Sequence, residues 1–80
     1  MAKLVVLDGG SRHGETTSVD EHVQRLLAVS EAPGLLDVYV SADRLTHVRG
    51  NAEPAVVFEF AGHESAEGVA PEAIHMPSHR

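Results

Sequence analysis

Residues 18–30 read Ser-Val-Asp-Glu-His-Val-Gln-Arg-Leu-Leu-Ala-Val-Ser, and the interpretation of this stretch decides the expected fold. Its apolar residues recur at the spacing of one helix face, at Val19, Val23, Leu26 and Leu27. Ser18 and Glu21 have the spacing of a capping box, in which the serine caps the helix and the glutamate reaches back to it. An Ala-Pro-Gly sequence at 32–34 is a typical helix end. The sequence therefore predicts an amphipathic helix over residues 19–31.

The residues before this stretch favour a hairpin. Residues 2–8 are typical of a strand, and the apolar run from Leu4 to Leu7 predicts that both of its faces are covered. A cluster of turn residues follows at 8–14. β-Branched residues then alternate with polar ones, so we expect a second strand near residues 15–17. The alternative is a loop that runs directly into the helix.

Further strands are expected after the helix. Polar and apolar residues alternate from Leu35 to Ser41 and again from Ala55 to Ala61. Residues 42–49 fit two structures: they have helical spacing, but they also suit an edge strand, which is the favoured interpretation.

Together these elements predict an α+β fold. A small antiparallel sheet of four or five short strands would carry one amphipathic helix at about 19–31, in the order strand, strand, helix, strand, strand, strand. The alternative is a three-stranded α/β fold in which residues 42–49 are helical. Residues 1–62 would form a single small domain. Residues 63–80 would form a C-terminal tail, flexible alone or docked on a partner through Ile74 and Met76.

The composition restricts the classes of function. Twelve acidic residues against six basic ones give a formal net charge of −6, which would repel a phosphate backbone, so direct nucleic-acid binding is not expected. The absence of cysteine excludes a disulfide and a thiolate nucleophile. The longest apolar run, Leu4 to Leu7, is too short to cross a bilayer, and no secretion signal is evident. We therefore expect a cytoplasmic location, or incorporation into a phage particle assembled in the cytoplasm.

The glycine-rich stretch at residues 9–14, Gly-Gly-Ser-Arg-His-Gly, is a candidate binding loop. Its backbone N–H groups and the guanidinium at position 12 could hold a phosphate-bearing ligand. The candidate residues for a ligand or partner are Gly9, Gly10, Arg12, His13 and Gly14. The stretch matches neither a Walker A loop nor a dinucleotide fingerprint. A tight turn also requires glycine, so an unliganded hairpin loop is the alternative.

The same stretch carries a first resemblance. Arg12-His13-Gly14-Glu15 resembles the Arg-His-Gly-Glu signature of the histidine phosphatase family, in which the histidine is phosphorylated. In that family the motif follows the first strand almost directly, and a second catalytic histidine lies far downstream in a longer chain. Here residues 8–11 intervene. The sequence therefore predicts a polar hairpin loop and no catalytic residue.

No cofactor or metal is expected either. His75 and His79 lie four residues apart, which on a helix would make a two-histidine metal clip, but Pro77 between them disfavours that helix. Aspartates, serines and threonines occur elsewhere in the chain, but no spacing among them supports a hydrolytic site.

A second resemblance covers both ends of the expected domain. The sequence Val6-Leu7-Asp8-Gly9-Gly10-Ser11-Arg12-His13-Gly14 resembles the opening of a group of small, mostly uncharacterised proteins of actinobacteria and their phages. Those proteins begin with a strand, a Gly-Gly-Pro-x-x-Gly turn and a second strand; Ser11 stands in place of the proline. Residues 56–63 are similar to the strand with which they often close. The resemblance implies a hairpin at each end and a bacterial or phage origin, but no activity and no site.

These observations predict a non-enzymatic interaction or assembly protein, a phage or bacterial accessory or particle component of the decoration type. It would work through a protein partner or through self-association. One alternative is a small acidic inhibitor or antitoxin-like protein that binds a basic partner. The other is a phosphate-ligand-binding module that uses the loop at 9–14.

Overall fold

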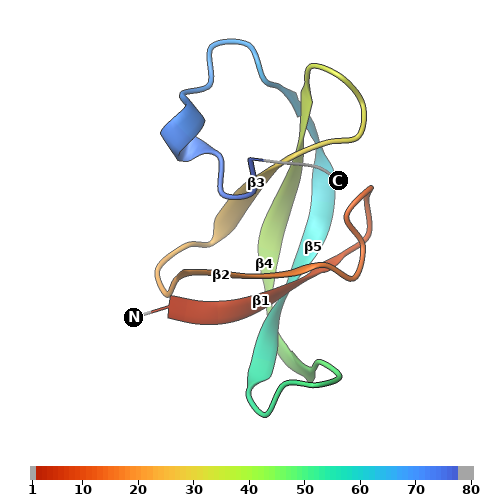
Figure 1. The fold of residues 1–80 in the computed structure, drawn as a ribbon, viewed down its shortest axis with the longest axis vertical. Helices are drawn as coiled ribbons and strands as arrows, with labels where there is room; N and C mark the ends of the chain where they lie inside the picture. The colour runs from red at the N-terminus through yellow and green to blue at the C-terminus, as the bar shows by residue number, and fades with distance from the viewer. Residues whose placement is uncertain (1, 78–80) are drawn as a thin grey trace.

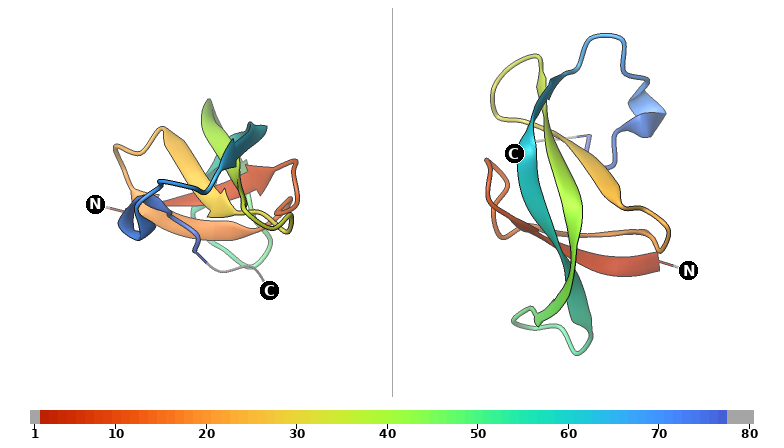
Figure 2. Two further views of the ribbon diagram at one scale, coloured as in Figure 1. Left: turned by 90° about the horizontal axis from the view of Figure 1, so that it is seen from above. Right: turned by 180° about the vertical axis from the view of Figure 1, so that it is seen from behind.

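Five strands form one strongly curled sheet. The structure, a computed structural model, describes residues 2–77. The elements are β1 (Ala2–Asp8), β2 (Thr16–Asp20), β3 (Arg25–Val29), β4 (Leu35–His47), β5 (Pro54–Ser65) and a short 3₁₀ turn, η1 (Pro71–Ala73). The order across the sheet is β2-β1-β5-β4-β3, with β1 and β5 parallel and the other pairs antiparallel (Figure 1). Seen from above, the strands curve around a common interior (Figure 2).

The predicted helix over 19–31 is wrong, and with it the α+β class. Within residues 2–77 the only helical segment is the three-residue η1. The chain instead leaves β2 at Asp20, whose Oδ1 accepts a hydrogen bond from the His22 N–H at 2.9 Å and so closes a turn that competes with helix initiation. The apolar residues that follow lie in β3, where both faces of the strand are covered.

The helix-like spacing has a simple origin in this strand–turn–strand arrangement. Val19 on β2 and Leu26 on β3 enter the same core cluster from opposite sides of the turn, and Val23 in the turn packs against it. Leu27 is buried in a second cluster on the other face of β3. The same residues would therefore be buried in either conformation, and their periodicity does not distinguish the two.

The other strand predictions have mixed outcomes. The hairpin of β1 with β2 is confirmed, with Leu4 opposite Ser18. Residues 42–47 are extended, as favoured, and the helical alternative and its three-stranded α/β fold are wrong. These residues continue β4, however, rather than form a separate strand. Asp43, with a φ of 55°, lies within a register shift of β4 against β5. The sheet is also mixed rather than wholly antiparallel, because β1 pairs with β5 in parallel.

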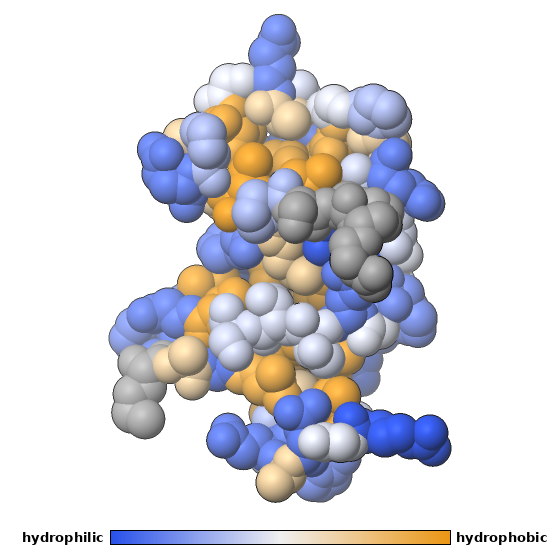
Figure 3. Space-filling view, viewed as in Figure 1, coloured by the Kyte–Doolittle hydropathy of each residue, from blue (hydrophilic) through white to orange (hydrophobic). Residues whose placement is uncertain are grey.

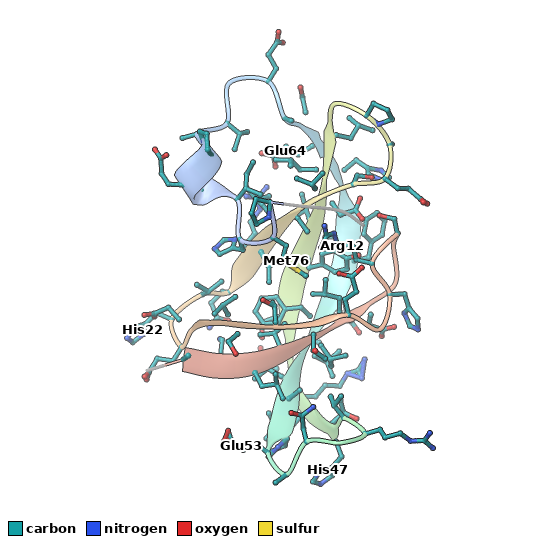
Figure 4. All side chains as sticks on the ribbon, in the orientation of Figure 1. Arg12, His22, His47, Glu53, Glu64 and Met76 are labelled. Carbon is teal, nitrogen blue, oxygen red and sulfur yellow. The ribbon has the colours of Figure 1, made fainter. Side chains whose placement is uncertain are left out.

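The core lies inside the curl of the sheet. Its buried members come from all five strands: Val5, Leu7, Val19, Leu26, Ala28, Tyr39 and Phe58. A smaller cluster of Leu27, Leu36 and Val38 lies on the opposite face of β3 and β4. The β4–β5 hairpin continues beyond the core as an arm, which carries His47 and Glu53 at its lower end (Figure 4).

Residues after β5 fold back on the outer edge of β3. The N–H groups of His75 and Met76 donate to the Leu27 carbonyl at 2.9 and 3.2 Å, and the Val29 N–H donates to the Met76 carbonyl at 3.0 Å. Ile74 packs against the smaller cluster and Met76 against the core. Both residues that the sequence singled out thus contact this chain's own sheet. β5 itself extends to Ser65, and the last part of the expected tail, 78–80, lies outside the described residues.

Candidate functional site

The loop at residues 9–14 joins β1 to β2 and is held by β4. The Tyr39 hydroxyl donates a hydrogen bond to the Gly9 carbonyl at 2.8 Å and accepts one from the Arg12 N–H at 3.4 Å. Gly10 lies against the rings of Tyr39 and Phe60, which meet edge to face with centroids 5.7 Å apart. The backbone of this loop is therefore fixed by side chains from the centre of the sheet.

Asp37 is the second anchor of the loop. Its side chain is fully buried, and its Oδ2 accepts hydrogen bonds from Ser11 Oγ at 2.6 Å and the Ser11 N–H at 3.3 Å. Its Oδ1 lies 3.1 Å from His63 Nε2, as an ion pair when the imidazole is protonated, but no described residue donates a hydrogen bond to it. The carboxylate stands between the serine and the histidine. A nucleophilic serine needs the imidazole beside its hydroxyl, so this arrangement anchors the loop and does not activate Ser11.

Arg12 points into the protein. Its side chain is 3% exposed, its Nε donates to the Val29 carbonyl at 2.9 Å, and an Nη1 proton goes to Glu15 Oε1 at 3.0 Å. Figure 4 shows it within the molecule, away from the arm. The guanidinium therefore ties the loop to the end of β3 and is not presented to a ligand in solvent.

His13 is the exposed member of the loop. Its side chain is 68% exposed, and its Nδ1 accepts a hydrogen bond from the Gly9 N–H at 2.8 Å. Asp8 lies 3.4 Å from the same nitrogen and also pairs with Arg44 at 3.3 Å. These groups border a shallow hollow of about 250 Å³, whose lining includes Val57. Acidic and basic groups are balanced around this hollow, which does not favour an anion.

The hydrogen bonds of its hydroxyl group with the loop make Tyr39 a sensitive probe of the loop's position. Burial, partly opposed by the hydrogen bond from the Arg12 N–H, raises the pKa of Tyr39 from 10.0 to about 12. The folded chain thus holds the phenol proton more tightly than the unfolded chain does. This stabilisation is complete below pH 10 and is lost between pH 10 and 12, a loss of up to roughly 2–3 kcal/mol.

Because Tyr39 is the only tyrosine, an ultraviolet absorbance titration reports this group alone. We expect a midpoint near pH 12 in the folded chain and near pH 10 in denaturant. A midpoint near 10 in the folded chain would show that the hydroxyl is not enclosed by the loop.

The edges of the sheet differ in how they are protected. The outer edge of β3 is covered by residues 75–76. The part of β4 beyond β3 is interrupted by the register shift at Asp43 and carries Arg44. No comparable protection occurs on β2, which has no proline, basic residue or bulge.

The backbone of β2 has free hydrogen-bonding groups on its outer side. The Leu7 N–H donates to the Glu15 carbonyl, and the alternation of an antiparallel ladder from that point turns the backbone groups of Thr16 and Ser18 away from β1. Within residues 2–77, nothing in the backbone bonds to these groups. β2 crosses one face of the molecule at mid-height (Figure 1), where the space-filling view shows pale, weakly polar atoms at the surface (Figure 3). We call Thr16–Asp20 on this side the open edge.

The residues that hold the candidate loop were missed by sequence reasoning. Asp37 and Tyr39 alternate with apolar neighbours and resemble a solvent-facing side of a strand, yet both are fully buried. The sequence places His63 at the start of the expected tail, but it lies in β5 and reaches Asp37. One signal was available: a carboxylate within the apolar run from Leu35 to Val40 needs a donor, and the nearby glycine-rich loop offers N–H and hydroxyl groups.

Within residues 2–77, no helix is long and apolar enough to cross a membrane, and no group of three or more histidine, aspartate or glutamate side chains could hold a metal ion. His79 lies outside the described residues. The chain matches no family model, no curated protein and no solved structure.

Proposed function

We propose that this chain is a non-enzymatic interaction or assembly protein, and that the open edge of β2 is its interaction surface. The single observation behind the proposal is the unpaired outer backbone of Thr16 and Ser18 on an edge that lacks the usual protection. An extended segment can add to such an edge through main-chain hydrogen bonds, which is a common mode of protein recognition.

The loop at 9–14 supports the non-enzymatic part of the proposal. Its reactive groups already have partners inside the chain: Ser11 donates to Asp37, and Arg12 donates to Val29 and Glu15. A catalytic or phosphate-binding loop would need such groups directed at a substrate. Here they stabilise the fold that presents β2.

The cellular setting is part of the same proposal. A phage or bacterial accessory or particle component, in the cytoplasm or in a phage particle assembled there, fits a small chain that works by strand addition. The acidic-inhibitor alternative gains less support, because acidic groups on the surface are partly neutralised. Asp8 and Glu59 pair with Arg44, and Glu64 pairs with Arg25.

Amide hydrogen exchange tests whether the edge is open. In dilute solution we expect the outward amides of Thr16 and Ser18 to exchange on the order of 100-fold faster than the inward amides of Thr17 and Val19, because only the latter face β1. The inward pair is a matched control within the same strand. Equal protection of all four amides at a concentration where the chain is monomeric would show that the edge is closed within the chain, and the proposed surface would then be wrong.

A further inference from the structure

We infer that the segment received by the open edge is β2 of a second copy, paired antiparallel about a two-fold axis at Ser18. The two curled sheets then join into one continuous sheet. This inference rests on the proposed function and specifies its partner. It follows from the length of the edge, the order of its residues and the protection of the other edges.

The outward backbone groups of β2 are placed symmetrically about Ser18, as a two-fold axis at that residue requires. Thr16, Ser18 and Asp20 alternate with the inward residues, so all three direct their backbone groups outward. A two-fold axis at Ser18 places Ser18 opposite itself and Thr16 opposite Asp20 of the partner subunit. The Asp20 carbonyl already accepts the Val23 N–H at 3.0 Å, so the new ladder ends at the Asp20 N–H. The match therefore uses the whole strand and stops at the turn.

The side chains also suit this register. On the exposed face the Thr16 hydroxyl lies opposite a carboxylate that can accept its proton, and on the inner face Thr17 lies opposite Val19 of the partner subunit, a pair of β-branched residues. The only charged residue of the strand, Asp20, lies at its end and never faces its own copy. No like charges are brought directly together.

The state of the other edges explains why one more copy suffices. Pairing of two identical edges is closed, because the open edge of each β2 is then hydrogen-bonded to the other. Growth beyond two copies would need a second open edge. β3 is covered by the chain's own residues 75–76, and the free part of β4 is interrupted at Asp43. Because β3, the other edge strand of the sheet, is covered, pairing through β2 favours a dimer over a fibre.

Charge predicts how salt affects this dimer. Each copy carries a net charge of −6, so the two copies repel one another at long range. Added salt screens this repulsion and should strengthen the association. An acidic inhibitor bound to a basic partner would show the opposite dependence.

The test uses the fact that Ser18 lies opposite its own copy in the inferred dimer. We would measure the mass of the full chain by light scattering over a concentration series, for the wild type and for Ser18→Lys, Ser18→Glu and an equimolar mixture of the two. The wild type should approach twice its 8.5 kDa mass. Each charged variant alone should dissociate at least about tenfold more readily, because like charges then meet at the axis. The mixture should recover the dimer.

Two controls keep the test specific. Ser18→Ala retains the outward backbone groups and should dimerise as the wild type does. Thr46→Lys and Thr46→Glu place the same charges on an exposed strand position of the arm, and they should not change the mass. Circular dichroism establishes that each variant is folded.

The outcomes separate this inference from the proposed function. A wild-type mass of 8.5 kDa at every concentration, with fast exchange at Thr16 and Ser18, would overturn the second-copy inference and leave the open edge standing. Dimers of both charged variants alone would place the interface elsewhere and also overturn it. Protected outward amides in a monomeric chain would overturn both proposals. Recovery only in the mixture supports the two-fold register.

Discussion

Replacing Gly10 by alanine should lower the free energy of unfolding by about 2–5 kcal/mol. A Cβ at this position would lie 2.6 Å from the Tyr39 hydroxyl oxygen and 2.6 Å from Phe60 Cδ1. Tyr39 is fully buried and Phe60 packs against the core, so neither side chain can move aside cheaply, and overpacking of about 1–3 kcal/mol adds to the backbone strain. The φ of 70° contributes that strain, about 1–2 kcal/mol for a residue with a side chain.

Gly14→Ala is the matched control. Gly14 has a similar φ of 87°, but a Cβ there would meet no atom within 4 Å. We expect only the strain of about 1–2 kcal/mol. Chemical denaturation of the two variants measures the difference. Equal losses would mean that the loop does not pack against Tyr39 and Phe60 as described.

Arg12→Ala should cost about 2–4 kcal/mol of stability. The substitution leaves the Val29 carbonyl and the Glu15 carboxylate without the hydrogen bonds of 2.9 and 3.0 Å, and it removes a buried side chain. A phosphate-binding arginine exposed to solvent would predict the reverse, namely lost ligand affinity with little change in stability.

Arg44→Ala provides the comparison. Arg44 also pairs with two carboxylates, those of Asp8 and Glu59, but about half of its side chain is exposed to solvent. Exposed ion pairs contribute about 0–1 kcal/mol, so this variant should unfold near the wild-type midpoint. If denaturant midpoints of the Arg12 and Arg44 variants coincided, Arg12 would not be the internal tie that the structure indicates.

The strands were largely predictable and the topology was not. Partial alternation of polar and apolar residues marks β4 and β5, and turn chemistry at 8–14 marks the first hairpin. The segment at 19–31 failed because Val19 and Leu26 are buried across a turn, at a spacing that an amphipathic helix shares. Parallel pairing of β1 with β5 leaves no local signature, because it joins residues far apart in sequence.

The candidate site was also only partly predictable from the sequence. The glycine-rich loop was identifiable because glycine, serine and arginine cluster there. Its role was not, because the decisive partners Asp37 and Tyr39 lie on another strand and their burial is a tertiary property. The open edge depends on which strands end up at the margin of the sheet. Sequence patterns predict strands, but they do not show which strands pair with one another in the sheet.

The parallel contact between β1 and β5 also governs how quickly this sheet can assemble. It pairs Val5 with Val56, so a closure of about fifty residues must precede its hydrogen bonds. The hairpin of β1 with β2 is local and can form within about 1–10 μs. Folding through such distant contacts takes milliseconds to seconds in comparable β proteins. Until then β1 is not paired with β5. The rate of folding is therefore set by this one long-range contact rather than by the local turns.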